Sequence, residues 1–117
     1  MTEALNITHT LCLPIKGDNI LLAMKKRGFG AGNWNGPGGR IEPGESPKQG
    51  AIRETFEEVG ITPKSLTEVA ILIFKFLDKP EWDRIVEVFT TYEWDGEPAE
   101  SEEMRPQWFK INEIPLS

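Results

Sequence analysis

Cysteine and histidine are each present only once in this sequence of 117 residues, as Cys12 and His9. A single cysteine excludes an internal disulfide, and one residue of each kind cannot build a four-cysteine or multi-histidine zinc site. Leu11 and Leu13 flank Cys12, so we interpret it as a small packing residue and His9 as part of a strand. The lack of disulfides fits a reducing compartment, and we expect a cytoplasmic protein.

Long apolar runs and an excess of positive charge are also missing. No segment approaches the roughly 20 apolar residues of a membrane span, and the first residues lack the pattern of a signal peptide. The 13 basic and 19 acidic residues give a net charge of −6, which argues against broad binding to nucleic acid or to a membrane. A polyanionic substrate would need a bound cation or local basic residues, and the only basic run is Lys25-Lys26-Arg27.

The hydrophobic pattern predicts strands around one helix in a single domain spanning residues 1–117. The glycine-rich stretch 28–39 carries Phe29 and Trp34, so we interpret it as a structured loop and not as a linker. The expected fold class is α+β with a mixed sheet. Apolar and β-branched residues predict strands at 4–13, 20–25, 65–77, 84–94 and 107–111, with an acidic loop at 95–103.

The helix is predicted over residues 46–59. Ser46 is a favourable N-cap, Pro47 suits the first helical position, and Gln49 completes a capping box. Gly60 provides the stop at the C-terminal end. Helical spacing predicts that one face is buried, and this face consists of Ile52, Thr55, Phe56 and Val59.

A second helical face carries Glu54, Glu57 and Glu58. Like charges at these spacings repel, so three carboxylates together cost stability unless a cation lies among them. Hard divalent cations prefer oxygen ligands, and Mg²⁺ typically combines one or two carboxylates with substrate phosphates. The pattern predicts a Mg²⁺ site, with Mn²⁺ as an alternative cation, and a phosphorylated substrate. A solvated helix face without function is the competing interpretation.

Two further features favour the metal site. The glycines of residues 36–39 let the backbone approach closely and can offer a carbonyl ligand. Arg53 is expected to pair with Glu45, which would hold the loop against the helix and orient the ligands.

The spacing of these residues resembles the signature of the Nudix hydrolase family. That signature is a glycine, five residues, a glutamate, seven residues, and then Arg-Glu-U-x-Glu-Glu-x-Gly-U, in which U is a bulky aliphatic residue. Every fixed position from Gly39 to Ile61 matches, and Thr55 at the first U position is the one departure. MKKRGFGAGNWNGPGGRIEPGE and SEEMRPQWFKINEIP are also similar to segments of the family members that hydrolyse oxidised purine nucleoside triphosphates.

The resemblance implies an α/β/α sandwich and a Mg²⁺-dependent hydrolysis of nucleoside triphosphates to the monophosphate and pyrophosphate. Water would attack phosphorus directly, and the reaction would clear oxidised purines from the nucleotide pool. A broader Nudix hydrolase of other nucleoside diphosphate derivatives is a second interpretation. A non-catalytic nucleotide-binding domain is a third, but the complete glutamate set favours catalysis.

The resemblance also implies roles for individual residues. The metal would be held by Glu54, Glu57, Glu58 and the Gly38 carbonyl. Either Glu57 or Glu103 would orient the attacking water, with Arg53 supporting the catalytic set. Lys25 would contact phosphate and Asn35 the purine edge, because an amide offers a donor and an acceptor together. The walls of the base pocket would be formed by Thr10, Phe29, Phe74 and Met104.

Departures from the family pattern concern the base end of the site. The family has a Trp-Pro-Asp-Asp segment that binds the base and then a long helix, and this sequence ends before both. Around Trp82 to Ile85 it carries one extra residue and no match for a methionine that the family places in the pocket. We therefore expect a sandwich without the C-terminal helix. The exposed sheet face would then favour dimerisation, domain swapping or low stability.

Overall fold

The computed structural model describes residues 6–28 and 31–113, so Phe29 lies outside the described residues. The predicted α+β class with a mixed sheet is confirmed. No helix in the described ranges is long and apolar enough to span a membrane. The elements are β1 (His9–Lys16), β2 (Asn19–Lys25), β3 (Trp34–Asn35), β4 (Gly38–Arg40), α1 (Pro47–Val59), β5 (Thr62–Pro63), β6 (Thr67–Phe74), η1 (Pro80–Trp82), β7 (Arg84–Thr91), β8 (Trp94–Asp95), β9 (Met104–Lys110) and η2 (Ile111–Glu113).

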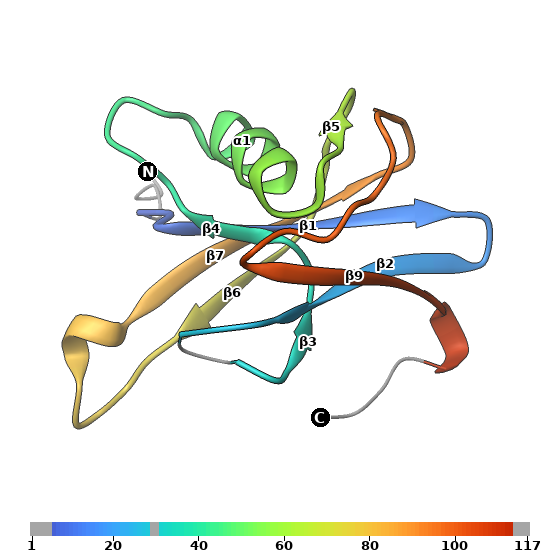
Figure 1. Ribbon diagram of the computed structural model, residues 1–117. Coiled ribbons are helices and arrows are strands. Elements are labelled where there is room, and N and C mark those ends of the chain that lie inside the picture. Colours follow the sequence, from blue (N-terminus) through green and yellow to red (C-terminus); the bar gives the residue numbers. More distant parts are fainter. Residues whose placement is uncertain (1–5, 29–30, 114–117) are drawn as a thin grey trace.

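Strand β1 organises the main sheet because it changes partners along its length. Its first residues, His9 to Leu11, pair antiparallel with β4, and its last two, Ile15 and Lys16, pair antiparallel with β2. On its other edge β1 runs parallel to β7, which in turn pairs antiparallel with β6. Beyond their shared turn the two strands have different partners, because β4 pairs with β1 and β3 pairs with β2 (Figure 1).

The predicted strands are present, with shifted ends. β1 begins at His9 instead of residue 4, and β9 begins at Met104 instead of residue 107. The stretch 28–39 contains two short strands, β3 and β4, that were not predicted. The pair of β5 and β8 was missed too, because two-residue strands are too short for an alternating pattern to show.

Helix α1 begins and ends as its sequence predicts. The Ser46 hydroxyl accepts from the Gln49 N–H at 3.1 Å, and the Gln49 side chain accepts from the Ser46 N–H at 2.8 Å. Gly60 takes the left-handed conformation, with φ of 81°, that ends the helix at low cost.

The predicted buried face of α1 is only partly right. Thr55 and Val59 are fully buried and Ile52 is half-buried, but Phe56 is 58% exposed. Successive helical residues are rotated by about 100°, so Phe56 lies at the margin of a stripe centred on Thr55. Ala51 is fully buried and completes the buried face in place of Phe56.

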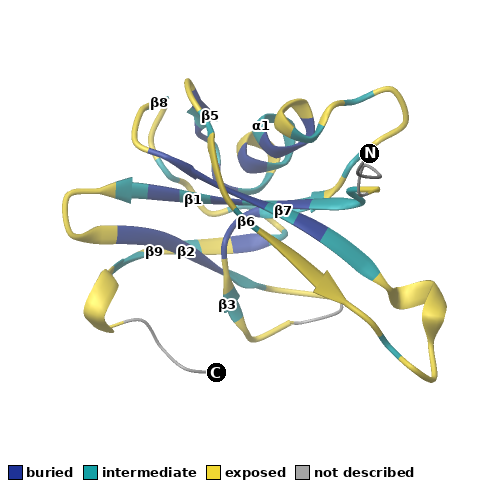
Figure 2. Ribbon diagram, turned by 180° about the vertical axis from the view of Figure 1, so that it is seen from behind, coloured by how far each residue is buried: buried dark blue, intermediate teal, exposed yellow. Residues whose placement is uncertain are grey.

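Helix α1 covers one face of the sheet (Figure 1). The core beneath its C-terminal end consists of Leu21, Ala23, Val59, Ile61 and Met104. Trp94 and Trp108 pack against this cluster and stack with ring centroids 5.9 Å apart. Strand β6 forms an edge of the sheet and is exposed along most of its length (Figure 2).

Candidate active site

Two glycines of β4 bring the backbone close to β1 and α1. A Cβ on Gly38 would lie 2.0 Å from the Thr10 carbonyl oxygen, so only glycine allows this strand contact. A Cβ on Gly39 would lie 2.8 Å from the Glu54 carboxyl group. The missing side chain therefore leaves room for that carboxylate against the strand.

Arg53 connects the carboxylates of this region. Its Nε and Nη2 donate to the two oxygens of Glu45 at 2.7 and 3.0 Å, which confirms the predicted ion pair. Its Nη1 donates to Glu54 at 2.8 Å and to Glu57 at 3.3 Å. The Glu45 carboxylate also accepts from the Glu42 N–H at 3.0 Å. Because Arg53 and this amide both favour the charged form, the pKa of Glu45 falls to about 2.

Glu58 is the carboxylate most affected by burial. Its Oε1 accepts from the Gly38 N–H at 2.7 Å. Burial raises the pKa of Glu58 to about 7, and repulsion from Glu54 and Glu103 adds to the rise. Burial also raises the pKa of Glu54, although Arg53 opposes this effect. A positive charge between these side chains would offset both costs.

Glu57 and Glu103, the two predicted orienting residues, lie in different surroundings. The Glu57 side chain is 54% exposed and accepts a hydrogen bond from Arg53. Glu103 accepts hydrogen bonds from the Arg27 guanidinium, which lowers the pKa of its carboxyl group. Glu103 is nevertheless close enough to Glu58 for the two charges to interact.

A cleft of about 320 Å³ opens beside Glu58. The Thr10 hydroxyl that borders it is buried and has no hydrogen-bond partner among the described residues. A buried polar atom without a partner is unusual and suggests a position where a ligand or water completes the bonding. The cleft is lined by His9, Thr10, Leu11, Lys25, Asn33, Asn35, Gly36, Gly38, Gly39, Glu58, Phe74, Phe76, Arg84, Val86 and Met104.

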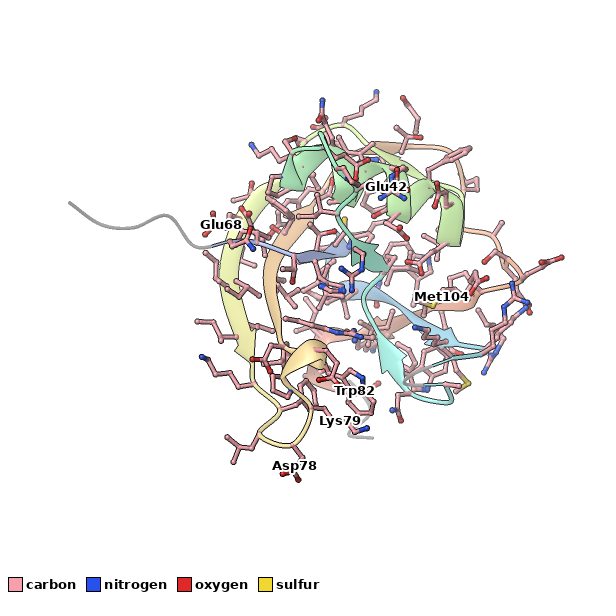
Figure 3. All side chains as sticks on the ribbon, turned by 90° about the vertical axis from the view of Figure 1, so that its left-hand side faces the viewer. Glu42, Glu68, Asp78, Lys79, Trp82 and Met104 are labelled. Carbon is pink, nitrogen blue, oxygen red and sulfur yellow. The ribbon has the colours of Figure 1, made fainter. Side chains whose placement is uncertain are left out.

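The structure brings most of the predicted site residues together around this cleft. Lys25, Asn35, Thr10, Phe74, Met104, Gly38 and Glu58 line it. Arg53, Glu54, Glu57 and Glu103 do not line it, although the Glu54 carboxyl group lies next to Gly39, which does. Figure 3 shows Met104 between the α1 side, marked by Glu42, and the opposite side, marked by Trp82. Phe29 cannot be placed, because it lies outside the described residues.

Sequence reasoning missed several lining residues, among them His9, Phe76, Arg84 and Val86. His9 was interpreted only as a strand residue, and it does lie in β1. The alternation of Arg84 with Val86 and of Phe74 with Phe76 is the signal that places each pair on one face. That signal does not reveal which face is the cleft, because this depends on the pairing of distant strands.

The donors around Glu58 suit a hard cation, although their present arrangement is not that of a metal cage. In residues 6–28 and 31–113, no three acidic, histidine or cysteine side chains are grouped as a set of ligands. Arg53 engages Glu54, and the Gly38 amide engages Glu58. The ligand atoms available here are carboxylate and carbonyl oxygens, which a hard cation prefers. Burial raises the pKa values of Glu54 and Glu58, so a cation between them would stabilise their charged forms. The residues therefore fit a divalent cation in chemistry.

Comparison with known sequences supports the family that the spacing of the glutamates predicts. A model of the NUDIX domain matches residues 6–117. The oxidized purine nucleoside triphosphate hydrolase of Danio rerio is 48% identical over 108 residues, which cover 92% of this chain and 69% of the relative. The enzyme of the same name from Mus musculus is 46% identical over 109 residues, with 93% of this chain and 69% of the relative covered.

Comparison with solved structures supports the same fold. The MutT NUDIX hydrolase from Burkholderia pseudomallei superposes with a TM-score of 0.84 at 24% sequence identity. The superposition covers 93% of this chain and 86% of that protein. At this identity the similarity concerns the arrangement of the strands and the helix.

Proposed function

The chain belongs to the NUDIX domain family, and on this premise we propose that it hydrolyses oxidised purine nucleoside triphosphates to the monophosphate and pyrophosphate. The observation that carries the proposal is a single cleft in which Lys25 and Glu58 share one space with Asn35 and Phe74. Its volume of about 320 Å³ lies in the range of small-molecule pockets. We place the reaction in the cytoplasm, where a chain with one buried cysteine stays reduced.

We propose that Mg²⁺, or Mn²⁺ in its place, is held by Glu54, Glu57, Glu58 and the Gly38 carbonyl. The support is the oxygen chemistry of these groups and the burial of Glu54 and Glu58. When bound, the cation would polarise a phosphoryl oxygen and favour ionisation of a water molecule. Glu54 accepts from Arg53 through Oε1, so its second oxygen, which lies beside Gly39, would be the one to reach the cation, while Glu45 keeps its paired hydrogen bonds to Arg53.

Residues in and near the cleft would bind the substrate and orient the attacking water. Lys25 would neutralise charge on the triphosphate, and Asn35 would contact the purine edge. Either Glu57 or Glu103 would orient the attacking water and take its proton. The water oxygen would bond to a substituted phosphorus of the triphosphate chain, and the bond from that phosphorus to the bridging oxygen would break. The electron pair would leave with that oxygen, and either phosphorus on the scissile bridge would yield the same monophosphate and pyrophosphate.

The test is the release of pyrophosphate and of phosphate from 8-oxo-dGTP and from dGTP, with and without Mg²⁺. We expect Mg²⁺-dependent pyrophosphate release that is faster from the oxidised substrate. Glu57→Gln should lower kcat by about 100- to 10,000-fold, the range for loss of a general acid or base, without a fall in Tm. Glu97→Gln provides the control, because Glu97 is exposed on the loop after β8.

Three other results would change the conclusion. Release of phosphate alone would exclude attack that yields pyrophosphate. Equal rates with many nucleoside diphosphate derivatives would favour a broader hydrolase. Nucleotide binding without turnover, by both the native protein and Glu57→Gln, would favour a binding domain.

A further inference from the structure

Glu103 is held beside the end of β2 through its backbone. Strands β2 and β9 pair antiparallel, and their last pair joins Lys25 to Met104, which both line the cleft (Figure 1). One residue farther along, the Lys26 N–H donates to the Glu103 carbonyl at 2.9 Å. The Ser101 hydroxyl accepts from the N–H groups of Glu103 and Met104 at 3.2 and 3.1 Å. These contacts hold the Glu103 backbone next to two residues of the cleft.

The Arg27 guanidinium holds the Glu103 side chain as well. Its Nε donates to Glu103 Oε1 at 3.1 Å, and its Nη2 donates to the same oxygen. The second oxygen, Oε2, accepts no hydrogen bond from the part of the chain that the structure describes. Glu103 is also close enough to Lys25 and Glu58 for their charges to interact. Arg27 therefore leaves one carboxylate oxygen available near the charged residues of the cleft.

The contact between Arg27 and Glu103 contributes little to the stability of the fold. The two side chains are 62% and 47% exposed, and exposed ion pairs contribute little because water screens them and both side chains lose freedom. Without a partner, a glutamate side chain with several rotatable bonds would occupy several rotamers. A displacement of about 1 Å in a group that acts on the reacting atoms can lower the rate by about 100-fold. The contact therefore affects the position of the carboxylate more than stability.

A second ion pair joins the same two segments of the chain. The Lys26 ammonium group contacts the Glu100 carboxylate, and the two side chains are 34% and 53% exposed. Neither residue lines the cleft. The two ion pairs are adjacent in sequence, but only Arg27 holds a residue of the proposed site. Lys26 therefore provides a matched comparison for Arg27.

We propose that Arg27 is a positioning residue for Glu103, because it holds the carboxylate by one oxygen and leaves the other to act on the reacting groups. This inference rests on the proposed function, in which Glu103 is one of two residues that would orient the attacking water. Arg27 would act through Glu103 and would not touch the substrate. Its removal should therefore slow the chemical step without weakening the binding of the nucleotide.

The experiment compares Arg27→Met, Arg27→Lys and the matched control Lys26→Met with Glu103→Gln and with the double variant Arg27→Met/Glu103→Gln. Pyrophosphate release from 8-oxo-dGTP at saturating Mg²⁺ gives kcat and KM. NMR scalar couplings show whether the Glu103 side chain holds one rotamer or averages over several. Unfolding temperatures show whether each variant is folded.

Arg27→Met should lower kcat by about 10- to 100-fold, the range for a misplaced group, with KM and Tm nearly unchanged. Arg27→Lys keeps the charge but loses the planar fork, so its kcat should lie between those of Arg27→Met and the native protein. Lys26→Met should match the native protein. The double variant should be no slower than Glu103→Gln, because residues that act as a unit are not additive. Glu103 should hold one rotamer in the native protein and average over several in Arg27→Met.

An equal loss of kcat in Lys26→Met would overturn the proposal, because it would assign the effect to the two segments as a whole. A rise in KM for Arg27→Met, or an additive loss in the double variant, would overturn it too, since Arg27 would then act on the nucleotide directly.

The NMR measurement keeps this inference separate from the proposed function. If the native protein hydrolysed no triphosphate, the proposed function would be contradicted, and a Glu103 rotamer that depends on Arg27 would still support the positioning role. Hydrolysis by the native protein, with a Glu103 rotamer and a kcat that do not depend on Arg27, would overturn this inference and leave the proposed function intact.

Discussion

Gly38 and Gly39 are adjacent in β4, yet their surroundings give them different tasks. The space that a Cβ would need at Gly38 is taken by the carbonyl oxygen of Thr10, which is part of the β1 backbone. The space at Gly39 is taken by the end of the Glu54 side chain, which can move. The first glycine therefore allows the sheet to form, and the second one positions a carboxylate.

Alanine substitutions should separate these two tasks. Gly38→Ala should lower the free energy of unfolding by about 1 to 3 kcal/mol or more, since overpacking against backbone has no easy relief. Gly39→Ala should keep Tm nearly unchanged but weaken Mg²⁺ binding and kcat/KM by about 10- to 100-fold, as displaced ligand contacts do. Thermal unfolding, metal titration and pyrophosphate release measure the three quantities. A stable, fully active Gly39→Ala protein would contradict the role of Glu54 as a ligand.

Helix α1 presents three faces, and each has a distinct function in the fold or the site. One face, with Thr55 and Val59, is buried against the sheet. The second carries the glutamates that Arg53 connects to the preceding loop. The third exposes Phe56, which amphipathic spacing alone had assigned to the core.

Truncating Phe56 and Val59 tests this corrected orientation of the helix. Val59→Ala removes buried carbon atoms and should cost about 2 kcal/mol, from lost burial plus the cavity that remains. Phe56→Ala should change the free energy of unfolding by less than about 0.5 kcal/mol, as exposed substitutions usually do. Urea denaturation of both variants provides the comparison. The opposite order of effects would show that Phe56 packs in the core.

At the scale of the molecule, the described residues carry much of their apolar exposure on edge strand β6. Val69, Ile73 and Phe74 are 54%, 54% and 44% exposed. The strand pairs with β7 on one side, and no other described strand pairs with its second edge. Unpaired backbone groups beside apolar side chains favour association with another copy.

We therefore expect the protein to associate with itself as its concentration rises. Ile73→Lys should reduce this association, because a charge on an edge strand opposes pairing. Ile111→Lys is the matched control, since Ile111 is 48% exposed but lies in η2 and not in β6. Size-exclusion chromatography with light scattering measures the mass of each variant. A monomer at every concentration, or an equal effect of both substitutions, would count against β6 as the cause.

The amino-acid sequence by itself determined the features that depend on neighbours along the chain. The caps of α1, the shared face of Glu54, Glu57 and Glu58, and the pairing of Glu45 with Arg53 could all be predicted. Helical geometry brings residues three or four positions apart onto one face, and like charges gathered there indicate a cation. The same local signals identified the mixed α+β fold and the family.

Only the tertiary structure decided the features that depend on pairing between distant strands. The change of partner along β1 is one such feature, because it pairs His9 with Arg40 of β4 but Ile15 with Ile20 of β2. The engagement of Glu103 by Arg27 and the electrostatic effect of Arg84 on His9 join residues still farther apart in sequence. A strand reveals which residues alternate, but its partners decide which face is covered and which borders a cleft. The carboxylates proposed to hold the cation thus lie on one helix, where the sequence shows them, whereas the cleft beside them forms only in the assembled sheet.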